Sequence, residues 1–158
     1  MKIAVIGAGS WGTTLADLLA ARGEQVMLWA WEDEVAGQIN TQRRNELFLP
    51  GVELSSNLRA TSELEQAVDG AEVVVTVCPT HVMRDVLSRA AVRMVDGAVL
   101  VNASKGIERG SLKRISELVE EVLPPEKMGA FAVLSGPSFA SEVAGRLPTV
   151  ITAASSNE

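Results

Sequence analysis

A glycine motif near the amino terminus has the spacing of a phosphate-binding turn. Residues 7–12 read Gly-Ala-Gly-Ser-Trp-Gly and follow a short apolar run. In this motif Gly7 allows a tight turn, Gly9 lets a pyrophosphate approach the backbone, and Gly12 lets the next helix pack closely. That helix would direct its first N–H groups at the phosphates. The motif predicts a dinucleotide site, and the alternative is a glycine-rich turn between two core elements.

Lys105 and Ser138 are placed to meet a phosphorylated ligand. Lys105 is one of four lysines, and it alone follows a strand predicted to be buried. Its ammonium group could hold a phosphate or polarise a carbonyl, and the alternative is a surface lysine. Ser138 follows a Gly-Pro turn and opens a helix, so its hydroxyl and nearby N–H groups could bind an anion. The alternative for Ser138 is a simple N-cap.

The residues after the second predicted strand bear on the choice of cofactor. An acid about twenty residues past the glycines binds the ribose of NAD, and Glu32 and Asp33 occupy that region. Both acids would also favour the start of a helix, which is the alternative interpretation. Trp31 brings no cation for the 2′-phosphate of NADP and could stack on adenine. The sequence therefore favours NAD, or the use of both cofactors.

Apolar strands alternate with helices along the whole chain. The pattern predicts strands at residues 2–6, 25–31, 72–78, 98–103, 130–134 and 148–153. It predicts helices at residues 10–22, from 32 onward, 62–68, 80–94, 111–123 and 139–144, the third opened by a capping box at Ser62 and Glu65. A long loop over 43–58 interrupts the alternation. We expect one α/β domain over residues 1–158, with a doubly wound, mostly parallel Rossmann-type sheet.

Four predicted strand ends carry unusual residues, near positions 7–12, 78–80, 104–106 and 135–138. Ligands bind outside the carboxyl ends of the strands in such sheets, so we expect all four ends to face one crevice. His81 at this edge is a formal acid–base candidate. We expect it, however, to lie in the first turn of a helix without a chemical role. Cys78 is expected to be a small core residue, and no metal site is predicted.

The composition excludes several classes of function. The 158 residues are 47% hydrophobic and 22% charged, with a net charge of −6 and no long basic run. This balance argues against nucleic acid and anionic membranes as partners. No apolar run is long enough for membrane insertion, and no removable signal peptide is expected, because residues 2–6 supply a strand that the fold needs. The single cysteine fits a reducing, cytoplasmic location.

Five segments together resemble the amino-terminal domain of bacterial NAD(P)-dependent glycerol-3-phosphate dehydrogenases. They are Gly-Ala-Gly-Ser-Trp-Gly-Thr at 7–13, Leu-Trp-Ala at 28–30, Phe-Leu-Pro-Gly at 48–51, Ser-Lys-Gly-Ile-Glu at 104–108 and Leu-Ser-Gly-Pro-Ser-Phe-Ala at 134–140. The last two are more specific than the glycine motif. The resemblance implies hydride transfer between a nicotinamide and dihydroxyacetone phosphate or sn-glycerol 3-phosphate, a reaction that feeds phospholipid synthesis.

The resemblance also implies roles for single residues. The cofactor positions that it implies are Ser10, Trp11, Phe48, Lys105 and Ala140. On the substrate side it implies Lys105, Gly136 and Ser138. At position 31 the family more often has Arg or His, so Trp31 favours NAD or both cofactors here. Cys78-Pro79-Thr80 replaces the family's usual Val-Pro-Ser, which is a mild departure.

In the family a second, helical domain follows and supplies the proton-accepting lysine and a clamp for the substrate phosphate. We therefore expect no catalytic residue within 1–158, no activity of this chain alone, and a possible homodimer of the full-length parent. Two other functions stay open from the sequence. One is a related dehydrogenase acting on a hydroxy acid or a nucleotide sugar. The other is a non-catalytic dinucleotide-binding module.

Overall fold

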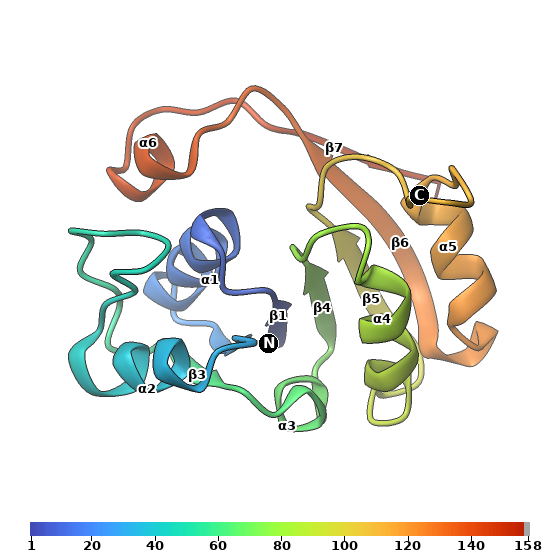
Figure 1. Ribbon diagram of the computed structural model, residues 1–158, viewed down its shortest axis with the longest axis horizontal. Helices are drawn as coiled ribbons and strands as arrows, with labels where there is room; N and C mark the ends of the chain where they lie inside the picture. Colours follow the sequence, from blue (N-terminus) through green and yellow to red (C-terminus); the bar gives the residue numbers. More distant parts are fainter. Residues whose placement is uncertain (157–158) are drawn as a thin grey trace.

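A single sheet organises the molecule, seen in a computed structural model that describes residues 1–156. Within these residues seven strands follow the order β3-β2-β1-β4-β5-β6-β7 across the sheet (Figure 1). All neighbouring pairs are parallel except β6 and β7, which are antiparallel. The strands are β1 (Lys2–Ile6), β2 (Gln25–Trp29), β3 (Arg59–Thr61), β4 (Val73–Thr76), β5 (Ala98–Asn102), β6 (Met128–Ser135) and β7 (Thr152–Ser155). The predicted mostly parallel, doubly wound sheet is confirmed.

Helices connect the strands and cover both faces of the sheet. They are α1 (Ser10–Ala21), α2 (Asp33–Gln42), α3 (Leu64–Val68), α4 (Met83–Ala91), α5 (Ile115–Val122) and α6 (Ala140–Ala144), with one 3-10 turn, η1 (Pro125–Lys127). None of the described helices is long and apolar enough to cross a membrane.

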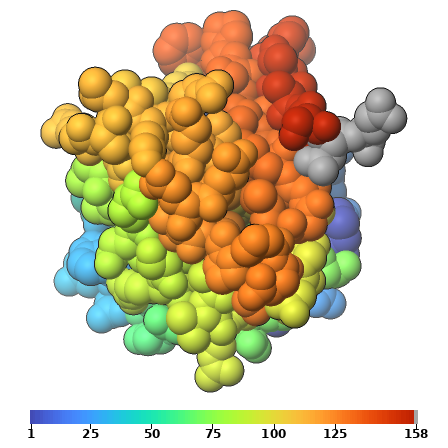
Figure 2. Space-filling view, turned by 90° about the vertical axis from the view of Figure 1, so that its right-hand side faces the viewer, coloured from blue at the N-terminus to red at the C-terminus, as the bar shows by residue number. Residues whose placement is uncertain are grey.

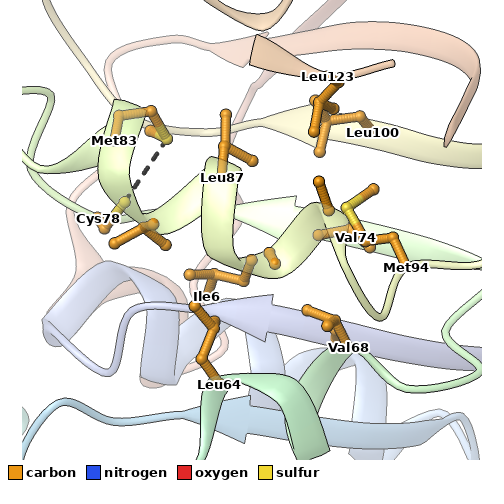
Figure 3. Close-up of a cluster of buried hydrophobic side chains, with 14 of the residues drawn as sticks. Ile6, Leu64, Val68, Val74, Cys78, Met83, Leu87, Met94, Leu100 and Leu123 are labelled. Carbon is orange, nitrogen blue, oxygen red and sulfur yellow. Dashed lines mark hydrogen bonds between the residues drawn. The ribbon is translucent and has the colours of Figure 1, made fainter. Parts of the chain in front are cut away.

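The apolar strands supply two cores because their side chains point alternately to opposite faces. In β1, Ala4 and Ile6 pack with α3, α4 and α5, whereas Ile3 and Val5 pack with α1, α2 and part of the 43–58 loop. Figure 3 shows the first core, in which Leu87 of α4 lies among side chains from β1, β4 and β5. A strand buried on both faces explains why the sequence showed continuous apolar runs instead of alternation.

Three strand predictions need correction. The second strand ends at Trp29 and not at residue 31, so Trp31 leaves the sheet before α2 begins. The last strand occupies Thr152–Ser155 and not 148–153, because residues 145–151 form the connection that leads from α6 back to the sheet. The strand Arg59–Thr61 was missed altogether, since three residues at the sheet edge carry almost no periodic signal.

The predicted capping box at Ser62 and Glu65 is wrong. Helix α3 begins only at Leu64, and no side chain caps it. Instead the hydroxyl of Thr61 accepts a hydrogen bond from the N–H of Glu63, while the Ser62 carbonyl accepts one from the Trp29 indole. Helices α4 and α5 are also shorter than predicted, because a turn at residues 92–93 ends α4 and residues 112–114 have no regular secondary structure before α5.

The connection between β6 and β7, residues 136–151, takes an unusual path. It crosses the carboxyl edge of the sheet, forms α6 beside α1, and returns to β7 (Figure 1). Figure 2 views the molecule from the side of α5 and β6, where the orange and red carboxyl-terminal part of the chain covers much of the face. The connection therefore brings residues 138–140 over the amino-terminal end of α1.

We predict that Gly12→Ala destabilises the fold while Gly37→Ala does not. A Cβ on Gly12 would lie 1.8 Å from the Gly7 carbonyl oxygen, whereas one on Gly37 would meet nothing within 4 Å. Overpacking at Gly12 should cost about 3 kcal/mol, and alanine at Gly37 inside α2 should gain about 0.5–1 kcal/mol. Urea denaturation of the two variants measures both effects, and equal stabilities would contradict the close approach of α1 to β1.

Candidate functional site

A cavity of about 960 Å³ lies across the carboxyl ends of β1, β4 and β5. This is the edge where the strand order reverses between β1 and β4, the switch point at which ligands bind in doubly wound sheets. Its size fits a cofactor or other small molecule. We call residues 7–12 the glycine loop, and its residues from Gly7 to Trp11 line the cavity. The other lining residues come from the ends of strands and from the loops beyond them, and they include Trp29, Trp31, Glu32, Phe48, Cys78, Pro79, His81, Asp85, Ser104, Lys105, Ser138, Phe139 and Ala140.

Each glycine of the motif has a different reason to be glycine. Gly7 adopts φ 117°, and a Cβ there would lie 2.9 Å from the Val77 carbonyl oxygen. Gly12 is required by its contact with Gly7. Gly9, in contrast, has ordinary backbone angles, and a Cβ on it would meet no atom within 4 Å. The fold therefore does not need glycine at position 9, and the space beside it opens to the cavity.

Lys105 stands where β5 ends, on a segment tied to the neighbouring strand. The Ser104 hydroxyl donates to the Cys78 carbonyl at 2.7 Å, which joins the ends of β4 and β5. The Asn102 side chain accepts from the Thr76 hydroxyl at 3.2 Å, below this junction. Among the described residues that line the cavity, Lys105 is the one lysine or arginine.

The segment after Lys105 is held by Glu108, whose side chain is largely buried. Arg84 of α4 donates two hydrogen bonds of 2.8 Å to the Glu108 carboxylate, and the Ser111 hydroxyl donates a third. These hydrogen bonds lower the pKa of Glu108 to about 2, and those from Arg84 have the largest effect. Arg84 also bonds Glu121 of α5 at 2.9 Å. The ion-pair network thus fixes the segment after Lys105 at Glu108, while the Ser104 hydrogen bond fixes the segment before it.

Two tryptophans and one acid lie at the end of β2. The Trp29 and Trp31 rings meet edge to face with centroids 6.1 Å apart, and the Trp29 indole N–H donates to the Ser62 carbonyl at 2.9 Å. Trp31 is 72% exposed, so a large part of its ring is free for a ligand. Glu32 lines the cavity and Asp33 does not. Of the two acids that the sequence left open, Glu32 is the one near the site.

The β6–β7 connection closes the cavity on the side of α1. The hydroxyl of Thr14 donates to the Ala140 carbonyl at 3.3 Å, and Arg146 donates to the Asp17 carboxylate at 2.8 Å. Asp17 also accepts from the Ser55 N–H at 2.7 Å, so the same buried carboxylate holds the 43–58 loop. Helix α1 therefore anchors both segments that flank the glycine loop.

Cys78 is a core residue, as predicted. Its side chain is 4% exposed and its thiol lies 3.6 Å from the Met83 sulfur (Figure 3). Burial raises the pKa of the thiol to about 11, so it is neutral at physiological pH and unsuited to act as a nucleophile. His81 lies in the turn before α4, lines the cavity and is exposed.

Most residues predicted to bind cofactor or substrate meet in this cavity. They are Gly7, Gly9, Ser10, Trp11, Trp31, Phe48, Lys105, Ser138 and Ala140. Gly12 faces Gly7 and does not line the cavity, and Gly136 lies outside the cavity, where a Cβ would come within 3.1 Å of the Val150 carbonyl oxygen. The sequence analysis missed Trp29 and Asp85, and it also missed Asn45, which is buried beneath the glycine loop. No periodic pattern marks these three.

The strand order and the glycine loop at the switch point define a domain of the Rossmann class. The family model described as "NAD-dependent glycerol-3-phosphate dehydrogenase N-terminus" matches residues 2–158. The chain therefore belongs to this family.

Relatives and solved structures agree with this assignment. The chain is 53% identical over 156 residues to a "Glycerol-3-phosphate dehydrogenase [NAD(P)+]" of Geobacter metallireducens, covering 99% of this chain and 47% of the relative. It is 50% identical over 157 residues to the protein of the same name from Citrifermentans bemidjiense, with the same coverage. The crystal structure of glycerol-3-phosphate dehydrogenase from Coxiella burnetii superimposes with a TM-score of 0.88 at 33% identity, covering 99% of this chain and 47% of that one. The chain thus spans about half the length of these relatives.

We predict that Glu108→Gln lowers the melting temperature at pH 7 and removes part of its acid dependence. Because the pKa of Glu108 is lowered in the folded state, its stabilising effect is fully present above pH 4.5 and is lost as the pH falls towards 2. The parent and the variant should therefore converge near pH 2. Glu120→Gln, at an exposed position of α5, is the control and should follow the parent at every pH. Parallel curves for the parent and Glu108→Gln would contradict the ion-pair network.

Proposed function

We propose that this chain binds NAD(H) in the cavity and forms the cofactor-binding part of an NAD(P)-dependent sn-glycerol-3-phosphate dehydrogenase. The observation that carries the proposal is the glycine loop, which is closed by protein contacts at Gly7 and Gly12 but open at Gly9. Lys105, which lines the same cavity, adds a cation suited to a phosphorylated substrate. The family membership of the chain supports the same assignment.

The residues present fit a dinucleotide along the length of the cavity. The N–H groups at the start of α1, from Gly9 to Trp11, suit the pyrophosphate. Trp31 and Glu32 suit the adenosine end, with the exposed ring for stacking and the carboxylate for the ribose hydroxyls. Phe48 and Ala140 supply apolar groups to the wall of the cavity. No metal is needed in this arrangement.

Lys105 and Ser138 are the residues that we assign to the substrate side. When bound, the nicotinamide supplies or accepts the hydride exchanged with dihydroxyacetone phosphate or sn-glycerol 3-phosphate. The ammonium group of Lys105 would hold the substrate and polarise its oxygen atoms. Ser138 also lines the cavity and would add a hydroxyl to the same phosphate or carbonyl. The product sn-glycerol 3-phosphate would feed phospholipid synthesis.

A turnover assay separates this function from its alternatives. The protein expressed from its natural reading frame should oxidise NADH with dihydroxyacetone phosphate and should be inactive with a 2-oxo acid or an oxidised nucleotide sugar. Activity with the latter substrates would favour a related dehydrogenase. Calorimetric binding of NADH without turnover of any substrate would favour a non-catalytic module. We further expect a cytoplasmic homodimer, for which light scattering is the test of assembly.

We predict that Gly9→Ala weakens NADH binding and changes stability by about 1 kcal/mol at most, the effect of alanine at an N-cap. The added methyl group meets no protein atom, yet it occupies the space through which a phosphate would approach. The Kd for NADH should rise roughly tenfold or more, because the methyl group would keep the phosphate too far away for a hydrogen bond to the backbone. A rise of this size corresponds to the loss of one hydrogen bond to a charged group. Calorimetry and thermal melting measure the two effects, and Gly37→Ala, which should leave the Kd unchanged, is the control for binding. An unchanged Kd for Gly9→Ala would contradict the assignment of the pyrophosphate site.

We predict that Glu32 makes the chain prefer NADH to NADPH. A carboxylate at this place accepts from the ribose hydroxyls and repels a 2′-phosphate, and no lysine or arginine among the described residues lines this end of the cavity. Glu32→Gln should lower the ratio of the Kd for NADPH to the Kd for NADH by roughly tenfold. Asp33→Asn, one residue further and outside the cavity, should leave the ratio as it is. Equal effects of the two substitutions would refute the role of Glu32.

A further inference from the structure

Asn45 is a polar side chain buried completely beneath the glycine loop. It follows α2 in the 43–58 loop and is 0% exposed. Its amide nitrogen donates to the Ala8 carbonyl at 2.9 Å and to the Thr13 hydroxyl at 2.8 Å, and its amide oxygen accepts from the Phe48 N–H at 3.2 Å. Both donor hydrogens of the amide are thereby used. A buried amide satisfied in this way holds its partners in one arrangement.

The Ala8 carbonyl receives a second hydrogen bond from the same cluster. The Thr13 hydroxyl donates to it at 3.1 Å, so one carbonyl oxygen is held by two buried side chains. Thr13 is itself 0% exposed and lies on the first turns of α1. The carbonyl therefore points away from the cavity, into the space between the glycine loop, α1 and the 43–58 loop.

The orientation of this carbonyl decides where the next N–H group points. Every described peptide bond is trans, and in a planar trans peptide the C=O and the following N–H point in opposite directions. With the Ala8 carbonyl held inwards, the Gly9 N–H is directed outwards. Gly9 lines the cavity, so this N–H faces the place where a phosphate would lie.

We propose that Asn45, together with Thr13, is a positioning residue that presents the Gly9 N–H to the phosphate of the cofactor. It orients the peptide between Ala8 and Gly9 before any ligand arrives, and it links this peptide to Phe48 on the cavity wall. The proposal rests on the proposed function, because it assigns the cavity to a dinucleotide. An aspartate at position 45 could donate neither of the two hydrogen bonds, which explains the need for an amide here.

Asn40 provides a control of the same residue type in the same part of the chain, although it is exposed where Asn45 is buried. Its amide nitrogen donates to the Ala60 carbonyl at 2.8 Å, and its amide oxygen accepts from the Ala60 N–H at 3.0 Å. Asn40 lies in α2 and Asn45 just after it, and each joins this part of the chain to a distant backbone segment. Unlike Asn45, Asn40 holds the edge strand β3 and does not line or touch the glycine loop. Both alanine variants should lower the melting temperature, but only one should affect the cofactor.

The test compares NADH binding, stability and the Gly9 amide signal in the 158-residue chain. For Asn45→Ala we expect the Kd for NADH to rise roughly tenfold, as for the loss of one hydrogen bond to a charged group, and the Gly9 amide resonance of the ligand-free chain to shift. Asn40→Ala should keep both the Kd and the Gly9 resonance. If the Kd stays unchanged in Asn45→Ala, or rises equally in both variants, the positioning role is refuted.

Thr13 variants decide the case if Asn45→Ala does not fold. Thr13→Val keeps the shape but removes the hydroxyl, so it should weaken NADH binding and move the Gly9 resonance. Thr13→Ser should restore both, which a purely space-filling role would not require. If Thr13→Val binds NADH like the parent, the proposal fails. If the parent itself does not bind NADH, the proposed function fails, while the Gly9 resonance of the ligand-free variants still tests the peptide orientation.

Discussion

The close approach of α1 to the end of β1 is the constraint on which the site depends. Gly12 lies so near the Gly7 carbonyl that no other residue fits, and a Cβ on Gly7 would lie 2.9 Å from the Val77 carbonyl oxygen, just after the end of β4. These contacts set the angle at which α1 leaves the sheet. Because α1 starts at the switch point, its first N–H groups meet the cavity, and the strand ends carrying Cys78 and Lys105 lie beside them.

Helix α1 does more than present its amino terminus. Its buried polar side chains Thr13, Thr14 and Asp17 bind two segments that are distant in sequence: the 43–58 loop, through Asn45 and Ser55, and the β6–β7 connection. Each of these bonds satisfies a group that would be costly to bury alone. The two segments that line the cavity beside the glycine loop are thus hydrogen-bonded to α1, the helix that begins at the cavity. These bonds fix the positions of the lining residues relative to one another.

The sequence was sufficient for the parts of the structure that follow from local rules. The glycine motif, the buried runs of β1, β4 and β5, and the edge rule for parallel strands together predicted that Lys105 and Gly9 would meet in one crevice. The failures share a physical cause, which is tertiary contact between distant segments. The position of β7 depends on how many residues the chain needs to place α6 against α1 and to return to the sheet. The burial of Asn45 depends on the fold of the 43–58 loop. Neither leaves a periodic signal in the chain.

The central claim is that a nicotinamide dinucleotide occupies the cavity between the glycine loop and Lys105. All three tryptophans of the chain, Trp11, Trp29 and Trp31, line this cavity and would lie within energy-transfer range of a bound dihydronicotinamide. Titration of the chain with NADH under tryptophan excitation measures occupancy directly. The account predicts saturable quenching of tryptophan with sensitised NADH emission, both reversed by excess NAD. Tryptophan emission that stays constant throughout the titration would contradict it.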